Sequence, residues 1–224
     1  MKWFAAMCIA FVACLIPALA SGQAALADYD YENLSFRGVS FSYGRIWPSK
    51  VDPSAIYTLR ADLGYLGPAV RIIPGISYWS ADLRTRELER FADRLEQLPP
   101  LLAQGIQLTP GDIGPIRWSD LSVGVDAQVV WTAPLRMLTY VGGGVAVHAL
   151  NGRGDLVANT FVEDLLDSTT PGFALMAGLE QQPLPRIRIF AEARYSMVSD
   201  LRYPELKFGG TLMFPAHDVT QGAR

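Results

Sequence analysis

Residues 117–131 read RWSDLSVGVDAQVVW, and their side chains alternate between apolar and polar. Leu121, Val123 and Val125 fall on one parity, whereas Ser122 and Asp126 fall on the other. Because successive side chains of a β-strand point to opposite faces, this period of two predicts a strand with one apolar and one polar face.

Alternating polarity recurs in seven further segments: residues 35–47, 56–66, 69–81, 137–150, 172–181, 186–197 and 206–214. The two faces are harder to sort in the glycine-rich segment 137–150. Tight links that contain proline join the second segment to the third, the fourth to the fifth and the sixth to the seventh. The other links are long, apart from a modest one at residues 199–205. An even strand number with short turns at one end and long loops at the other is the pattern of outer-membrane barrels. In the third segment Pro74 cannot donate a ladder hydrogen bond, so we expect a bulge or weak pairing there.

A sheet in a bilayer must close on itself, because hydrocarbon offers no partner to an unpaired backbone group. No run after the first residues approaches the roughly 18 apolar residues of a membrane helix. We therefore predict an all-β fold, an eight-stranded antiparallel up-and-down transmembrane β-barrel over residues 35–215. Aromatic residues near the segment ends predict two interfacial belts. The turn-end belt would hold Tyr65, Trp131 and Phe214, and the loop-end belt Trp47, Tyr57, Trp79, Trp118 and Tyr195.

The first residues have the form of a secretory signal peptide. Lys2 supplies a positive end, an apolar stretch follows, and small residues allow cleavage after Ala20 or Ala27. We expect residues 1–27 to be removed and residues 28–34 and 216–224 to be flexible. A retained anchor helix and a lipoprotein modified at Cys14 are the alternatives. Cys8 and Cys14, the only cysteines, lie in this leader, so the mature chain has no disulfide.

Charge and composition exclude several function classes. The chain has 19 Lys and Arg against 22 Asp and Glu, a net charge of -3 that becomes -4 once Lys2 is removed. This balance gives no basic footprint for nucleic acid. Without mature cysteines, and with His148 as the one histidine of the predicted barrel, we expect no transition-metal site and no cofactor. Asp155, Glu163, Asp164 and Asp167 crowd one loop, but without the spacing of an EF-hand calcium site.

Charged residues of both signs share the polar parity of the predicted strands. An eight-stranded barrel is just wide enough for side chains to fill its interior, and charges there must pair. We predict a structural network of ion pairs in the lumen, with an ion-conducting pore as the alternative. Its members are Arg60, Asp62, Arg71, Asp120, Asp126, Gln128, Glu180, Arg188, Glu192, Arg194 and Lys207.

The last segment carries a short motif. A polar residue, a glycine two positions on, and two spaced hydrophobic residues are found at Lys207, Gly209, Leu212 and Phe214. The motif resembles the C-terminal signal that the barrel assembly machinery recognises, although ten residues follow Phe214. Over residues 35–214 the chain resembles the eight-stranded outer-membrane β-barrel superfamily, which includes the OmpA transmembrane domain and many "porin family" proteins. This resemblance implies an outer-membrane location in a Gram-negative-type envelope.

Two features outside the strands remain. Apolar residues at helical spacing predict a short helix at residues 84–98, in a long extracellular loop, which either packs over the barrel mouth or touches lipopolysaccharide or a partner through its arginines. Residues 161–166 could form a second short helix. Some members of the outer-membrane barrel superfamily that this chain resembles are lipid A hydrolases or acyl transferases. In the deacylases a serine follows the histidine by two positions, but here Leu150 follows His148 by two, so the motif fails. A constellation with Asp120 and Ser122 is geometrically possible.

We therefore predict a monomeric outer-membrane barrel with a structural or surface-interaction role, no open pore and no enzymatic activity. Its expected partners are outer-membrane lipid, lipopolysaccharide and, during biogenesis, the barrel assembly machinery. The alternatives are a lipid A-modifying membrane enzyme and a soluble periplasmic lipocalin-like barrel around a small apolar ligand. The alternatives differ in orientation: a soluble ligand barrel places its charges outside, whereas a membrane barrel places them inside.

Overall fold

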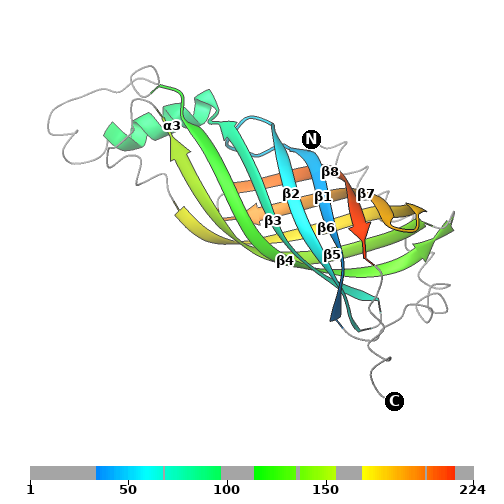
Figure 1. Cartoon of the computed structure of the whole chain (residues 1–224). Coiled ribbons are helices and arrows are strands. Elements are labelled where there is room, and N and C mark those ends of the chain that lie inside the picture. Colours follow the sequence, from blue (N-terminus) through cyan, green and yellow to red (C-terminus); the bar gives the residue numbers. More distant parts are fainter. Residues whose placement is uncertain are drawn as a thin grey trace, which may run out of the picture.

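The computed structural model describes residues 34–67, 69–96, 114–134, 137–154, 168–199 and 201–214. Eight antiparallel strands form a closed barrel in sequence order, so β8 pairs with β1 (Figure 1). The strands are β1 Leu34–Ile46, β2 Ser54–Gly67, β3 Val70–Asp82, β4 Arg117–Ala133, β5 Met137–Arg153, β6 Ser168–Leu184, β7 Ile187–Val198 and β8 Leu201–Met213. The all-β, up-and-down barrel is confirmed. The leader, the expected tail at residues 216–224, the acidic loop residues and the possible helix at 161–166 lie outside the described ranges.

The link between β7 and β8 corrects one prediction. We expected a modest loop at residues 199–205, but β8 begins at Leu201, so only residues 199 and 200 separate the two strands. Pro204 is tolerated in this strand because its ring is exposed and its carbonyl still accepts a hydrogen bond from the Trp47 N–H at 3.1 Å. The residues on either side of the proline, Tyr203 and Glu205, consequently point into the barrel.

Pro74 lies at an irregularity of the sheet, as predicted. The β2–β3 pairing is regular up to Arg60 opposite Gly75, and it resumes with Tyr65 opposite Arg71. Four residues of β2 therefore face three of β3, which is the two-against-one count of a bulge. Gly64 has a φ of +75°, a conformation that glycine adopts without steric cost, and its N–H donates to Asp62 Oδ1 at 2.9 Å.

The link from β3 to β4 contains helix α3, Thr85–Glu96, which confirms the helix expected at residues 84–98. It lies at the loop end of the barrel (Figure 1). Leu88 and Ala92, four positions apart on one face, are buried, whereas Glu89 and Arg90 are exposed. No helix in the described part of the chain is long and apolar enough to cross a bilayer.

The interior is layered along the barrel axis. An apolar cluster closes the loop end and consists of Ile46, Val51, Ile56, Trp79, Ala81, Leu150, Val198, Leu201 and Tyr203. A smaller cluster of Tyr65, Val130, Tyr140 and Met176 lies toward the turn end. The link between β1 and β2 is tied across the loop end by backbone hydrogen bonds from Ser49 N to Arg202 O at 3.2 Å and from Asp52 N to Asp82 O at 2.9 Å. We call the loop-end cluster and this link the plug.

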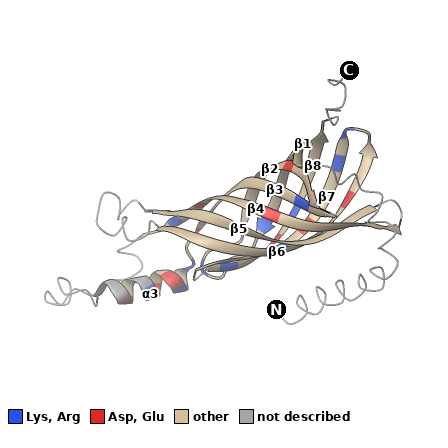
Figure 2. Ribbon diagram, turned by 90° about the horizontal axis from the view of Figure 1, so that it is seen from below, with Lys and Arg blue, Asp and Glu red and all other residues tan. Residues whose placement is uncertain are grey.

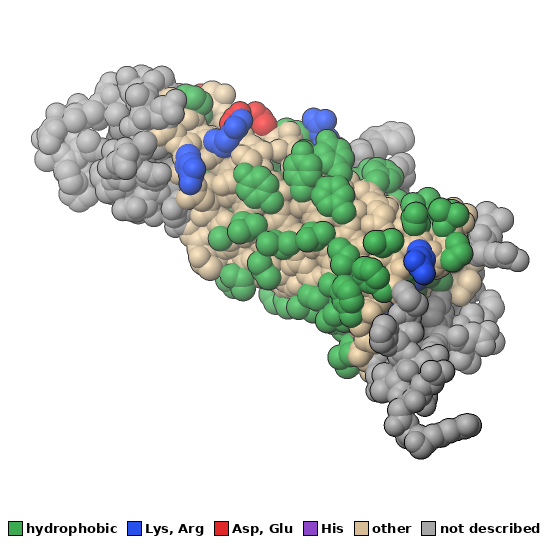
Figure 3. Space-filling view, viewed as in Figure 1, with side chains coloured by type: hydrophobic (Ala, Val, Ile, Leu, Met, Phe, Trp, Pro, Cys, Tyr) green, Lys and Arg blue, Asp and Glu red, His purple; other side chains and the backbone are tan. Residues whose placement is uncertain are grey.

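The outer wall is apolar. On the face shown in Figure 3, hydrophobic side chains cover the wall, and the charged side chains lie at its margins. Large hydrophobic residues exposed on it include Phe41 at 55%, Val123 at 59% and Phe173 at 64%. A soluble protein rarely leaves so continuous an apolar surface in water.

The predicted belts are partly wrong. Trp47, Tyr57, Tyr195 and Phe214 are exposed on the wall, and Tyr43, Tyr78 and Phe36 join them. Trp79, Tyr65 and Trp131 are buried, and Trp118 is half-buried against the plug cluster. Tyr65 turns inward because the extra residue of the β2 bulge shifts the alternation by one. Trp79 has the inward parity of β3. The prediction placed it in a belt because it lies near a strand end, and this choice was wrong.

Candidate functional site: the charged lumen

The residues that sequence analysis assigned to the lumen are all brought together inside the barrel. Figure 2 shows that the charged positions are interspersed along its strands. Arg60, Asp62, Arg71, Asp120, Asp126, Gln128, Glu180, Glu192 and Lys207 are buried, and the side chains of Arg188 and Arg194 are 11% and 12% exposed. The alternation of the strands thus gives a barrel whose charges are sealed from the outside.

Glu192 is the centre of the network. Its two carboxylate oxygens accept from Arg60 Nη1 at 2.7 Å and Nη2 at 2.6 Å, a bidentate pair across the lumen from β7 to β2. Tyr140 Oη donates to the same carboxylate at 2.9 Å, and Lys207 Nζ lies 3.6 Å from Oε1. Glu192 is 1% exposed, so these partners replace all of its hydration.

A second group, nearer the turn end, surrounds Arg71. Its Nη1 donates to Glu180 Oε2 at 2.9 Å, its Nη2 also donates to Glu180, and its Nε donates to Gln128 Oε1 at 3.2 Å. Arg188 Nη1 donates to the same glutamate at 3.2 Å, and both arginines lie within 4 Å of Asp62, at 3.8 and 3.7 Å. The Arg71 guanidinium also lies over the Tyr140 ring, 5.5 Å from its centroid.

A third group, nearer the loop end, includes a residue that sequence analysis missed. Glu205 lies 2.8 Å from Lys207 Nζ and accepts from Ser196 Oγ at 2.5 Å. Arg194 Nη1 donates to Asp126 at 2.8 Å, and its Nε lies 3.9 Å from Glu205. The prediction placed Glu205 in a loop, because it began the last strand at residue 206, whereas β8 begins at Leu201. Its position two residues before Lys207 was the signal that could have identified it.

His148 forms a separate pair with Asp120. The distance from Nδ1 to Asp120 Oδ2 is 2.8 Å, and the Trp79 indole donates to the same oxygen at 3.0 Å. Ser122 is the cross-strand neighbour of His148, but none of the hydrogen bonds among the described side chains joins a hydroxyl to His148. A Cβ on Gly172 would lie 2.7 Å from Nε2, so that nitrogen faces a backbone with no side chain. The geometry gives the imidazole a carboxylate partner but no nucleophile.

Five cationic side chains of the lumen face five of its carboxylates. Arg60, Arg71, Arg188, Arg194 and Lys207 face Asp62, Asp126, Glu180, Glu192 and Glu205, and Asp120 is paired with His148 instead. Charges removed from water are stable only when pairing and hydrogen bonds compensate for the lost hydration. A cavity beside Arg60, Arg71 and Tyr140 measures about 10 Å³, which is room for about one water. Within the described ranges, no group of His, Cys, Asp or Glu could hold a metal ion.

The four positions of the suggested assembly motif occupy different environments. Lys207 is inside, whereas Leu212 and Phe214 are 51% and 41% exposed on the wall. Gly209 allows a close approach, because a Cβ there would lie 2.5 Å from Phe190 Cζ. The C-terminal strand therefore presents its hydrophobic residues outward while its lysine completes the lumen network.

Of the comparisons with known proteins, the one with solved structures bears on the fold. No family model and no curated protein matches the chain. Among solved structures, Neisserial surface protein A of Neisseria is 15% identical with a TM-score of 0.51, and the match covers 82% of this chain and 100% of that one. Ail of Yersinia pestis, solved with the heparin analogue sucrose octasulfate, is 13% identical over 80% and 97% of the two chains with a TM-score of 0.42. The N-terminal β-barrel domain of Pseudomonas aeruginosa OprF is 11% identical over 79% and 97%, with a TM-score of 0.41. The chain has the eight-stranded outer-membrane barrel fold, as the sequence resemblance predicted.

Proposed function

We propose that this chain is an outer-membrane β-barrel with a sealed lumen, exported through its leader, and that it acts as a structural or surface-interaction protein of a Gram-negative-type envelope. The observation that carries the proposal is the orientation of the wall. Apolar side chains face out and ion pairs face in, the arrangement of a membrane barrel and the opposite of a soluble ligand-binding barrel. The likeness to Neisserial surface protein A supports the same fold.

The sealed lumen follows from two barriers in series. The ion-pair network fills the middle of the barrel, and the plug closes the loop end with residues such as Ile46 and Val51, both 0% exposed. A hydrated ion would have to break paired charges and also enter an apolar layer, and both steps are costly. A role at the cell surface therefore belongs to the outer wall and the loops rather than to transport through the barrel.

The proposal extends to the biogenesis and the oligomeric state of the barrel. Lys207, Gly209, Leu212 and Phe214 would be recognised by the barrel assembly machinery, and lipid and lipopolysaccharide would surround the wall. We propose a monomer, because the barrel closes through β1 and β8 and leaves no unpaired sheet edge.

Conductance measurements test the sealed lumen. Purified, refolded protein added to a planar lipid bilayer is expected to give no discrete current steps, because both barriers would have to open for an ion to pass. Folding of the inserted protein is checked in parallel by comparing the migration of unheated and heated samples on SDS gels, which differs for a folded barrel. Stable, ion-selective openings of the inserted protein would contradict the proposal and favour a pore.

A further inference from the structure

We propose that the wall formed by β3, β4 and β5 is a binding site for one phosphate-bearing membrane lipid, with its phosphate held by Arg117 and Arg153 and an acyl chain in an apolar groove below them. This inference rests on the proposed membrane location, and it adds a specific ligand to it. Two separate features of the same strands carry the inference, one for the headgroup and one for the chain.

The first feature is an arginine pair at the loop end. Arg117 of β4 and Arg153 of β5 are direct cross-strand partners, and both are exposed on the outer wall. Like charges that face each other across a ladder destabilise a sheet. On the other side Asp82 of β3 pairs with Arg117, with 3.1 Å between Nε and Oδ1, while Arg153 Nε donates to the Asn151 amide oxygen at 3.0 Å. Among the described residues, Arg117 thus has a carboxylate partner and Arg153 has none.

The geometry of this pair suits a phosphate. In each arginine the hydrogen bond to a neighbouring side chain uses Nε, and among the described residues the terminal N–H groups of both exposed side chains make no hydrogen bond. The planar guanidinium fork matches phosphate oxygens, and an anion between the two arginines would remove their mutual repulsion. The side chain of Arg117 is 67% exposed, so an incoming headgroup can reach it.

The neighbouring outward side chains of β3, β4 and β5 indicate the depth of the arginine pair in the membrane. Moving from mid-barrel to the loop end, the outward positions of these three strands form an apolar row of Tyr78, Leu121 and Ala149, then a row of Ser80, Ser119 and Asn151, and then the row of Asp82, Arg117 and Arg153. Along this order the side chains change from apolar and aromatic to uncharged polar and then to charged, as expected on passing from the hydrocarbon layer to the headgroups of a bilayer. The arginine pair therefore lies at the level of lipid headgroups.

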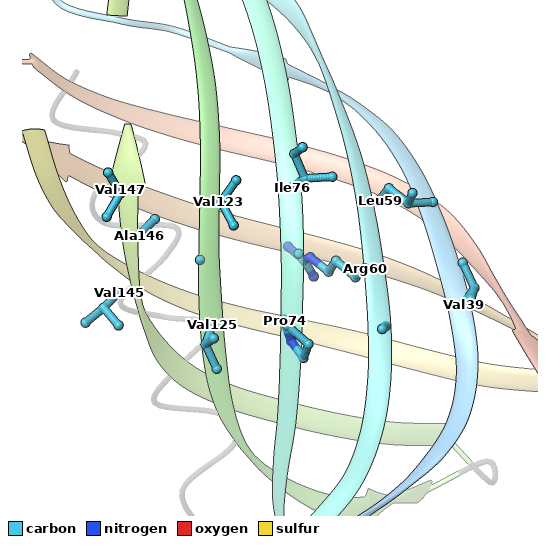
Figure 4. A pocket seen from close by; sticks show the side chains of 13 residues that line it. Val39, Leu59, Arg60, Pro74, Ile76, Val123, Val125, Val145, Ala146 and Val147 are labelled. Carbon is cyan, nitrogen blue, oxygen red and sulfur yellow. The ribbon is translucent and has the colours of Figure 1, made fainter. Parts of the chain in front are cut away.

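The second feature is a groove of about 680 Å³ in the apolar wall, shown in Figure 4. Two rows of outward side chains border it: Leu59, Ile76, Val123 and Val147 in one row, and Val39, Ala61, Pro74, Val125 and Val145 in the other. Between the rows lie Arg60, Gly75, Gly124 and Ala146, which have the inward parity of their strands, and the two glycines present only backbone to the groove.

The two features share β4 and β5 and lie at different depths, separated by a distance that a lipid can span. Val123, at the upper row of the groove, is six residues from Arg117 on β4, which is about 20 Å along a strand. With the usual tilt of about 35–45°, the groove begins about 15 Å below the arginines, within the hydrocarbon layer. At that depth hydrocarbon is the available occupant, so the groove would take the acyl chain of the lipid whose phosphate the arginines hold.

Native mass spectrometry of the folded full chain in detergent micelles tests the site. The probes are dimyristoylphosphatidic acid, dimyristoylglycerol without the phosphate, and inorganic phosphate alone. We expect one phosphatidic acid to bind at least about ten-fold more tightly than dimyristoylglycerol, because two charge-assisted contacts are involved. Equal binding of dimyristoylglycerol, or displacement of the lipid by millimolar inorganic phosphate, would overturn the proposal.

Variants assign the binding to the two features. Arg117→Ser with Arg153→Ser is expected to weaken phosphatidic acid binding about ten-fold, and Asp82→Asn to strengthen it by removing the competing carboxylate. Arg202→Ser, at an exposed arginine of β8, is the matched control and should leave binding unchanged. Val125→Trp should fill the groove and weaken binding several-fold, whereas Leu175→Trp on β6 should not.

Folding of each variant is checked by its heat-dependent migration on SDS gels. Variants that fold and insert but bind phosphatidic acid like the parent protein would overturn the lipid site alone. A parent protein that stays soluble without detergent would overturn the membrane location and the lipid site together, so the two failures are distinguishable.

Discussion

Glu192→Leu is expected to lower the free energy of unfolding by about 3–5 kcal/mol, because it leaves Arg60 and Lys207 buried without their shared carboxylate. Urea unfolding of the protein in lipid vesicles, followed by tryptophan fluorescence and by the gel shift of the folded form, measures this loss. Glu89→Leu, at an exposed position of α3, is the control and should change the stability by about 0.5 kcal/mol or less.

A double-mutant cycle separates the pair from its surroundings. Arg60→Met alone should also be strongly destabilising, while Arg60→Met with Glu192→Leu should cost clearly less than the sum of the two single changes, because the double variant leaves neither member of this pair unpaired. Additive losses, or a loss below about 1 kcal/mol for Glu192→Leu, would show that the lumen pairs do not stabilise the barrel in this way.

Val123→Arg is expected to destabilise the inserted barrel by about 2–4 kcal/mol, since it places a charge in mid-wall, where hydrocarbon surrounds it. The same vesicle unfolding assay measures the effect. Val123→Leu keeps the position apolar and should be nearly neutral, and Leu184→Arg near the turn end should cost about 0–1 kcal/mol. If the outer wall faced water, Val123→Arg would be as harmless as Leu184→Arg, and that result would contradict the membrane location.

Period-two alternation predicted most of this fold. The eight strands, their order and the inward face of the charged residues follow from side-chain parity, which a strand imposes directly. Side-chain parity predicted which charged residues lie inside the barrel, but not which of them pair. Arg60 and Glu192 were both expected inside, and nothing in the sequence indicated that they contact each other. Such pairing depends on barrel register and on which side chains reach across the lumen.

The predictions were wrong where the alternation of side chains is interrupted or where another sequence signal, such as a proline, was given more weight. The bulge at Gly64 turns Tyr65 inward, and a one-residue insertion of this kind leaves only a weak trace in sequence. Pro204 suggested a loop, although an outward-facing proline is compatible with β8, and Glu205 was missed as a result. The plug was not foreseen either, because Val51 comes from the link between β1 and β2. A bridge from Val51 to Leu83 and backbone hydrogen bonds from Ser49 to β8 and from Asp52 to β3 hold this link in place.

The central claim is that apolar side chains face lipid while charged ones are enclosed, and a spin-label scan of β4 tests it most directly. Single cysteines can be placed from position 121 to 130, since Cys8 and Cys14 are the only native cysteines and lie in the predicted leader. In vesicles, collision with oxygen, which concentrates in hydrocarbon, should be high at Leu121, Val123, Val125 and Val129 and low at Ser122 and Val130. High accessibility to a water-soluble nickel complex at the first set, or oxygen maxima at the second, would contradict the account.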